Sequence, residues 1–334
     1  HVGFFCCARL CASVQRMKIL TRCAMLLVLA CSAATATPAN RLFTDAELIA
    51  EYAARPSMFV TIDGVRIHYR DEGRGPTLVL INGHLGSLHM WDAWVERLRD
   101  RFRIVRLDFP PYGLSGPDPE NLYSSQRAAG LVGRFLDHLG LARVHIGGTS
   151  NGALVAVLFA IDNPERVDRL VVSTLPAGRP PARTPSPALI AAATADRATA
   201  PVQSRAFHEA FLRDIIANDA VIDDALIDRY WKLNNRVGAR ANETTYIQAQ
   251  YRFWDSTDVP ALYARLRRPL LLQWGADGVV LPEQIGRDVA ALLPNAPVTL
   301  IQYRGAGHLP MLEKPDETAR DAAAFLTETR SSLQ

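Results

Sequence analysis

The chain has no cysteine after position 31. All five cysteines stand at positions 6, 7, 11, 23 and 31 of the 334 residues. The body of the protein can therefore contain no disulfide and no thiol nucleophile, even in an oxidising compartment. Its stability must come from a hydrophobic core, which a chain of this length with 49% hydrophobic residues is able to bury.

The residues after position 36 also carry no large net charge. The net charge is +3, but Arg9, Arg16, Lys18 and Arg22 all lie within residues 1–36, which hold no acidic residue. Without these four positive charges the net charge is −1. The sequence therefore offers no basic surface of the kind that binds nucleic acid, and we expect no nucleic-acid partner.

Cofactor motifs are absent as well. The sequence has no His-Glu-x-x-His, no paired metal-ligand spacing, no phosphate-binding loop and no dinucleotide fingerprint. We expect neither a metal nor an organic cofactor, so the chemistry must come from ordinary side chains.

Residues 1–36 are predicted to be upstream residues plus a signal peptide. Met17 is a plausible start, and basic residues are followed by an apolar run at 23–31 and by Ala34-Thr35-Ala36, which fits small-x-small cleavage. The apolar run is too short to span a bilayer. We expect an exported product, periplasmic or secreted. A lipid anchor at Cys31 is the alternative, but Leu29 is untypical of a lipobox.

Beyond the leader, short apolar runs alternate with amphipathic segments. A hairpin is predicted over residues 58–69, with its turn at Asp63-Gly64. Further strands are predicted at 77–81, 103–107, 144–146, 170–173, 269–274 and 298–303. Helices are predicted at 41–55, 91–98, 122–139, 153–161, 283–293 and 316–329. This alternation predicts an α/β fold with a mostly parallel central sheet flanked by helices.

The alternation stops between the sixth and seventh strands. The interval is far longer than an ordinary connection. It begins with a proline-rich linker at 176–187 and continues with helical patterns at 202–216, 221–233 and 244–254. We predict a core made of residues 37–174 and 269–334, with a helical cap at 175–268 that lies over the strand ends.

Ser150 lies in the stretch that the chain is organised around. A buried strand runs straight into an apolar helix through Gly148-Thr149-Ser150-Asn151-Gly152. A turn this tight needs glycine on either side of the serine, and it leaves the hydroxyl exposed at the positive end of the new helix. A serine held in this way can attack a carbonyl if a base removes its proton.

Two further residues are candidates for partners of Ser150. His308 follows the last strand in a glycine-rich loop, at the sheet edge where the serine is expected, and can serve as the base. Asp277 follows the preceding strand and can hold the histidine's tautomer and stabilise its cation. The order Ser150, Asp277, His308 is the order of the α/β-hydrolase arrangement.

From about Phe59 to Phe325 the chain resembles the α/β-hydrolase superfamily, in its capped, esterase-like subgroup. The resemblance includes Asn82-Gly83-His84, the loop from Asp108 to Ser115, and the stretch from Gly307 to Pro315. It implies an oxyanion hole made by the backbone N–H groups of His84 and Asn151.

The sequence departs from the family pattern at two positions. Asn82 replaces the usual histidine, whose role is mainly architectural, so we expect the oxyanion loop to survive. The family's acid stands three residues after the glycine that ends the strand, and counting from Gly275 this position is Gly278. Asp277 comes one residue early. It is nevertheless the only carboxylate between Asp258 and Glu283, so we predict that it is the acid.

These features predict a serine hydrolase that cleaves a small-to-medium carboxylic ester through an acyl-enzyme intermediate. A lactonase or a hydrolase of carbon–carbon bonds can use the same three residues and remains an alternative. A non-catalytic ligand-binding protein on the same scaffold is a third possibility, because fold does not fix function. The contact between Asp277 and His308 discriminates between the catalytic and non-catalytic interpretations.

Overall fold

A computed structural model describes residues 40–328 of the chain. The leader predicted at residues 1–36 lies outside the described residues. Between residues 40 and 328, none of the helices is both long and apolar enough to cross a membrane.

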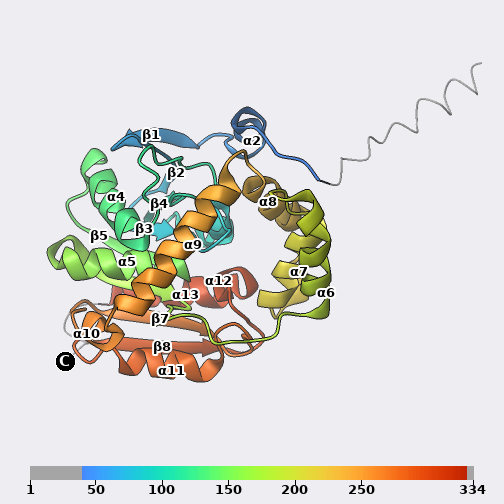
Figure 1. The fold of residues 1–334 in the computed structure, drawn as a ribbon. Helices are drawn as coiled ribbons and strands as arrows, with labels where there is room; N and C mark the ends of the chain where they lie inside the picture. The colour runs from blue at the N-terminus through green and yellow to red at the C-terminus, as the bar shows by residue number, and fades with distance from the viewer. Residues whose placement is uncertain (1–39, 329–334) are drawn as a thin grey trace, which may run out of the picture. The chain divides into compact units, whose positions relative to one another are not determined.

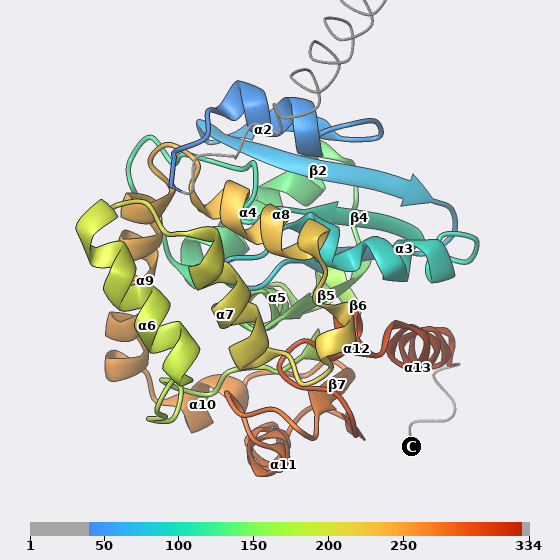
Figure 2. The ribbon, with the colours of Figure 1, turned by 90° about the vertical axis from the view of Figure 1, so that its right-hand side faces the viewer.

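An eight-stranded sheet forms the centre of the fold, in the order β1-β2-β4-β3-β5-β6-β7-β8 (Figures 1 and 2). Its strands are Met58–Ile62, Val65–Gly73, Thr77–Ile81, Arg103–Leu107, Val144–Thr149, Val167–Ser173, Leu270–Gly275 and Val298–Tyr303. β2 pairs antiparallel with β1 and β4, and every later pair is parallel. Parallel pairing brings the carboxyl ends of β5, β6, β7 and β8 to one edge of the sheet, where the candidate residues are found.

Helices of the core pack in pairs, α4 against α5 and α3 against α13. The described core helices are α2 (Asp45–Tyr52), α3 (Asp92–Leu98), α4 (Ser125–His138), α5 (Asn151–Asp162), α11 (Glu283–Ala291), α12 (Pro310–Glu313) and α13 (Pro315–Thr327). α5 is apolar on all sides because it is enclosed by the sheet and α4, and residues 152–161 are all buried.

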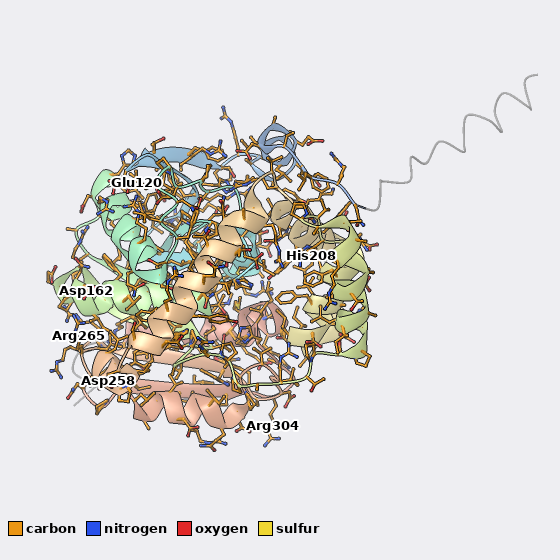
Figure 3. All side chains as sticks on the ribbon, viewed as in Figure 1. Glu120, Asp162, His208, Asp258, Arg265 and Arg304 are labelled. Atoms are coloured by element: carbon orange, nitrogen blue, oxygen red, sulfur yellow. The ribbon has the colours of Figure 1, made fainter. Side chains whose placement is uncertain are left out.

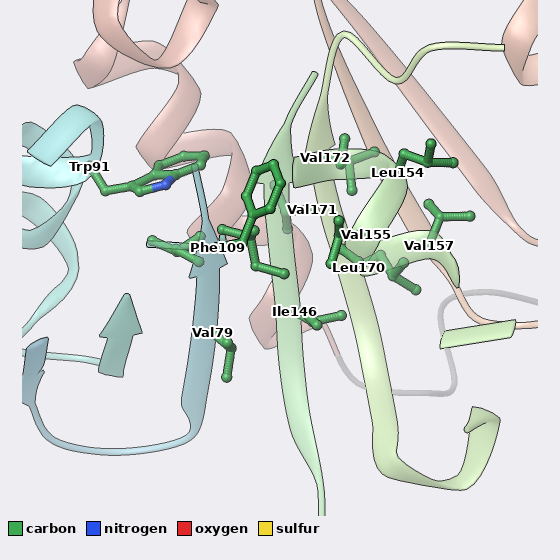
Figure 4. Close-up of a cluster of buried hydrophobic side chains, with 14 of the residues drawn as sticks. Val79, Trp91, Phe109, Ile146, Leu154, Val155, Val157, Leu170, Val171 and Val172 are labelled. Carbon is green, nitrogen blue, oxygen red and sulfur yellow. The ribbon is translucent and has the colours of Figure 1, made fainter. Parts of the chain in front are cut away.

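A cluster of fully buried apolar side chains lies where β3, β5 and β6 meet α5. Figure 4 shows Val79, Ile146 and Val171 of these strands among Phe109 and the α5 side chains Leu154 and Val155. All six are at most 1% exposed. This core holds the end of β5 and the start of α5 rigidly, and therefore fixes the turn between them. At the periphery, the exposed side chains of Arg265 and Asp162 form an ion pair at 2.9 Å (Figure 3).

The interval between β6 and β7 is helical. It contains α6 (Pro187–Ala195), α7 (Arg205–Ile215), α8 (Asp224–Asn234), α9 (Ala239–Ser256) and the short α10 (Val259–Tyr263). In Figure 1, α9 crosses obliquely over the sheet region, and α6, α7 and α8 stand beside it.

The predicted strands at 58–62, 77–81, 103–107 and 298–303 are confirmed to the residue. The hairpin turn at Asp63 and Gly64 is also confirmed, with positive φ at both positions. β2 is longer than predicted because its second half pairs with β4. α6 is missing from the prediction because the proline-rich pattern that ends at Pro187 is typical of a linker, whereas Pro187 occupies the first turn of a helix capped by Ser186.

Candidate active site

Ser150 stands between β5 and α5 in a strained backbone conformation, with φ 52° and ψ −122°. The two glycines that flank it permit this turn. A Cβ on Gly148 would lie 2.4 Å from the carbonyl oxygen of Gly152, and a Cβ on Gly152 would lie 2.2 Å from that of Asn82. The packing around both ends of the turn therefore maintains the strain, as is typical of a nucleophile elbow.

His308 approaches Ser150 from the loop between β8 and α12. Its Nε2 lies 3.1 Å from Oγ of Ser150, so the hydroxyl can donate to the ring. The backbone of His308 is held on both sides: its N–H donates to the carbonyl of Ile215 in the interval, and its carbonyl accepts from the hydroxyl of Thr174. The structure thus brings together two of the three residues singled out from the sequence.

Asp277 does not contact His308, and the prediction that it holds the ring is wrong. Its side chain is exposed, and Oδ2 accepts the N–H of Gly305 at 2.7 Å. Nδ1 of His308, the atom that a triad acid would engage, is buried and has no hydrogen-bond partner within residues 40–328. The reason is the one-residue offset on the loop: Asp277 faces solvent, and the buried position beside it is Gly278.

Burial favours the neutral form of His308. Burial, followed by the electrostatic effects of His84 and Arg183, lowers the pKa of the ring from 6.5 to about 4. No carboxylate counteracts these causes. His308 is therefore a neutral but weak base at neutral pH.

The loop after β3 comes close to the serine from the other side. A Cβ on Gly83 would lie 3.5 Å from Cβ of Ser150. Asn82 shapes this loop: its Nδ2 donates to the carbonyls of Gly83 and Gly86, both at 3.0 Å, and its Oδ1 accepts the N–H of Phe109 at 2.9 Å. The amide of Asn82 thus holds this loop, at the position where the family usually has a histidine.

Two backbone N–H groups next to Ser150 have no internal acceptor in the described part of the chain. They belong to His84 and to Asn151, the first residue of α5. The two ring nitrogens of His84 have partners other than Ser150: Nδ1 lies 2.6 Å from the hydroxyl of Tyr112, and Nε2 lies 3.4 Å from Oε1 of Glu243.

A cavity of about 250 Å³ opens above these groups. It is lined by the strand-end residues Ser150, Asn151 and His308 and by residues of the helical interval, among them Phe211, Ile247 and Trp254. The lining is mostly apolar, as is usual for small-molecule sites. Its one arginine, Arg183, is paired with Asp214 at 2.6 Å. In the described residues no cluster of three or more His, Cys, Asp or Glu side chains is placed to hold a metal ion.

Comparison with known families agrees with this geometry. Residues 76–315 match the family model of the alpha/beta hydrolase fold, which covers more than half of the chain. The chain belongs to the α/β-hydrolase family.

Similar members of the family include characterised and uncharacterised hydrolases. This α/β hydrolase is 26% identical over 283 residues to the uncharacterised hydrolase YugF of Bacillus subtilis (strain 168), covering 82% of this chain and 99% of that one. It is 26% identical over 296 residues to the 2-hydroxy-6-oxononadienedioate/2-hydroxy-6-oxononatrienedioate hydrolase of Burkholderia vietnamiensis (strain G4), covering 85% and 99%. Among solved structures, a bacterial membrane phospholipase A superposes with a TM-score of 0.69 and 23% identity, covering 93% and 98%.

Glu313 has a larger part in the site of this α/β hydrolase than its sequence position indicates. Its carboxylate, 3% exposed, accepts four backbone N–H groups: those of Gly307 and Leu309 on either side of His308, and those of Ala217 and Asn218 in the interval. Glu313 therefore orients the histidine loop, although it never touches the ring. Only a view of the folded chain reveals this, because two of its donors lie almost a hundred residues away.

A second hydrogen-bonded series of Ser, His and Asp lies elsewhere in this α/β hydrolase. Nε2 of His68 lies 2.9 Å from Oγ of Ser57, and Nδ1 of His68 lies 2.8 Å from Oδ2 of Asp108. The same aspartate accepts the N–H groups of Leu88 and Leu114. These contacts fix the loop after β4 and give His68 a structural role.

Proposed function

We propose that this α/β hydrolase is a serine hydrolase that cleaves a small-to-medium carboxylic ester through an acyl-enzyme intermediate. The expected contact between Asp277 and His308 is absent, so the proposal rests on the serine and the histidine themselves. The observation that carries it is the 3.1 Å distance between Oγ of Ser150 and Nε2 of His308, at a strained elbow that lines an apolar cavity. A nucleophile, its base and a space for the substrate meet there.

Each group has a step in the proposed reaction. Oγ of Ser150 attacks the ester carbonyl while Nε2 of His308 takes the hydroxyl proton. The N–H groups of His84 and Asn151 form the oxyanion hole, in which each donor typically stabilises the transition state by about 3 kcal/mol. His308 gives the proton to the leaving alcohol. Water then attacks the acyl enzyme with His308 as base, which restores the serine.

The charges around the cavity favour an uncharged substrate. Arg183 is the cation of the lining, but Asp214 pairs with it and cancels its attraction for an anion. An ester with apolar acyl and alcohol groups of modest size fits both the volume and the lining.

Cleavage of a carbon–carbon bond or of a lactone by the same serine and histidine is the second candidate. It is favoured by the similarity to the hydrolase from Burkholderia vietnamiensis named above. A panel of short-chain esters, lactones and vinylogous 1,5-diketones, tested on the full chain, separates the two by the ratio of their kcat/KM values.

Covalent labelling tests the proposal directly. A fluorophosphonate probe should label the wild-type protein and leave Ser150→Ala unlabelled, and p-nitrophenyl acetate should be hydrolysed by the wild type alone. A well-folded wild-type protein that takes up no probe and hydrolyses nothing on the panel would instead support a non-catalytic ligand-binding protein.

We also infer that the chain is exported, on the strength of the leader sequence alone. Intact-mass measurement of the product from a secreting host should give an N-terminus near Thr37. A diacylglyceryl group on Cys31 would establish the lipid-anchored form, and an unprocessed cytoplasmic chain would contradict export.

A further inference from the structure

The carboxylates nearest to the histidine loop are all engaged elsewhere. Asp277 accepts the N–H of Gly305, and Glu313 accepts four backbone N–H groups. Asp214 pairs with Arg183, and Glu243 lies against His84 and Arg240. Nδ1 of His308 is thus left without a hydrogen-bonded anion in the described part of the protein.

Gly278 occupies the position from which such an anion would come. It is buried, and its φ lies outside the left-handed region, so the backbone does not require glycine there. A Cβ built on it would lie 3.5 Å from the carbonyl oxygen of Gly275 and from the carbonyl carbon of Gly307, which are ordinary contacts. It would lie 3.3 Å from the carbonyl oxygen of Leu281, which is tighter than usual and requires that oxygen to shift by a few tenths of an ångström. By contrast, a Cβ on Gly275 would lie 1.8 Å from the carbonyl oxygen of Gly307.

Whether a side chain at position 278 could reach His308 depends mainly on the direction of this Cβ. Gly307 immediately precedes His308, so a side chain at 278 would start beside the backbone of the base. Asp277, one residue earlier, starts on the exposed side of the same loop. A change of one residue would therefore place a carboxylate on the buried side of the loop.

Building on the proposed function, we propose that Ser150 and His308 act as a dyad without a carboxylate, which restricts the enzyme to acyl donors with good leaving groups, such as aryl esters, enol esters and thioesters. Every tetrahedral transition state of this reaction contains an imidazolium ion, and no anion stabilises it here. The cost is smallest for activated acyl groups, because their transition states come early and carry less positive charge on the ring. Alkyl esters need a fully formed imidazolium to protonate the departing alkoxide, so their rate of cleavage is lowered most by the lack of a carboxylate.

For such acyl donors, each bond and each proton of the reaction can be followed through the two steps. The bond from Oγ of Ser150 to the acyl carbon forms as the hydroxyl proton passes to Nε2 of His308. The acyl–leaving-group bond then breaks, and the phenolate, enolate or thiolate departs with its electron pair. The imidazolium releases its proton to the leaving group or to solvent. Water deacylates the serine, and His308 relays one of its protons back to Oγ.

Installing the missing carboxylate tests this inference. The proteins compared are full-length wild type, Gly278→Asp, Gly278→Asn and Gly278→Ala, with p-nitrophenyl, phenyl and ethyl acetate as substrates. Removal of the acid from a complete triad lowers kcat by up to about 10⁴, so even a partly aligned Asp should raise kcat/KM for ethyl acetate at least tenfold. The gain for p-nitrophenyl acetate should be smaller. The Asn and Ala variants supply no charge and should stay within about threefold of wild type.

The ionisation of His308 gives a second readout that needs no turnover. In NMR titrations the His308 ring of wild type should remain neutral well below pH 6.5, and Gly278→Asp should raise its pKa. The charged or titratable groups around the ring are His84, Arg183, Asp214, Glu243 and Glu313, none of which changes between these variants. The shift can therefore be assigned to the new carboxylate.

Two results would overturn the dyad. One is a folded Gly278→Asp that matches Gly278→Ala in both rate and titration. The other uses only the wild type: an acid limb of kcat/KM near pH 6.5 together with similar rates for ethyl and phenyl acetate would mean that an anion reaches Nδ1. Labelling of Ser150 by fluorophosphonate separates these failures from a failure of the proposed function, in which no label is taken up.

Discussion

Two serine–histidine pairs in this protein have nearly the same hydrogen-bond geometry but different surroundings. The pair Ser57–His68 has the aspartate, because Asp108 binds Nδ1 of its histidine. The pair Ser150–His308 has none within residues 40–328, but it has the strained elbow, the N–H groups of His84 and Asn151 without an internal acceptor in that range, and a cavity. In the first pair, Arg70 Nε also donates to the serine oxygen at 2.9 Å, and Phe59 stacks on the imidazole. The complete series Ser57–His68–Asp108 thus fixes the surroundings of β2, whereas the incomplete pair Ser150–His308 lines the cavity. Ser150, the proposed nucleophile, is therefore distinguished from Ser57 by its position at the elbow and its access to the cavity, and not by a more complete set of hydrogen bonds.

Replacing each of the two serines by alanine should give the largest difference in activity, and it tests whether the two pairs have different roles. Ser150→Ala should lower kcat for p-nitrophenyl acetate by at least about 10³, because the acyl-enzyme route is lost. Ser57→Ala, the matched control, should keep both turnover and fluorophosphonate labelling. Retained activity in the first variant, or lost labelling in the second, would reverse the assignment of roles.

The acid of the Ser57 pair should affect stability and not turnover. Asp108 is 1% exposed and fixes three donors, so Asp108→Asn leaves a buried amide facing N–H groups. We expect the free energy of unfolding in urea to fall by about 3 kcal/mol. kcat per folded molecule should stay within a few-fold of wild type. An unchanged denaturation midpoint would contradict the structural role.

Low pH should destabilise the fold through a histidine outside both pairs. His208 of α7 (Figure 3) is fully buried, and burial followed by the charge of Arg240 lowers its pKa from 6.5 to about 3. Between these two values the unfolded chain binds a proton that the folded protein does not, so the free energy of unfolding falls as the pH falls below 6.5. His208→Leu should make that decline shallower, by up to about 1.4 kcal/mol per pH unit. Parallel urea titrations at several pH values measure it, and identical slopes would contradict the burial of a neutral ring.

The smallest expected effect concerns Asp277. Its exposed carboxylate accepts only the N–H of Gly305, and an amide oxygen can do the same. Asp277→Asn should therefore leave kcat within about threefold of wild type, whereas a triad acid would lose about 10⁴. A large loss would show that the loop rearranges to bring Asp277 to His308 during turnover.

Sequence patterns predicted the parts of this molecule that depend on local chemistry. Buried strands are apparent as apolar runs, and Ser150 is marked by glycines whose absent side chains the turn requires. His308 follows from its place after the last strand. The lack of a carboxylate at the His308 ring could not be predicted in the same way. One residue of loop register decides whether a side chain faces the ring or the solvent, and no periodicity in the sequence records that register. The role of Glu313 was equally hidden, since half of its hydrogen-bond donors come from a distant segment.

The hydrogen bonds that Glu313 accepts make the position of His308, the proposed base, depend both on the core and on the helical interval between β6 and β7. The carboxylate binds N–H groups on both sides of His308 and others in the helical interval, and His308 itself donates to Ile215. A core excised from its helices would keep every proposed catalytic side chain and still release the loop that aims the imidazole. Exchanging the interval for that of a relative would therefore alter the catalytic rate as well as substrate choice, unless the residues at 215–218 came with the core.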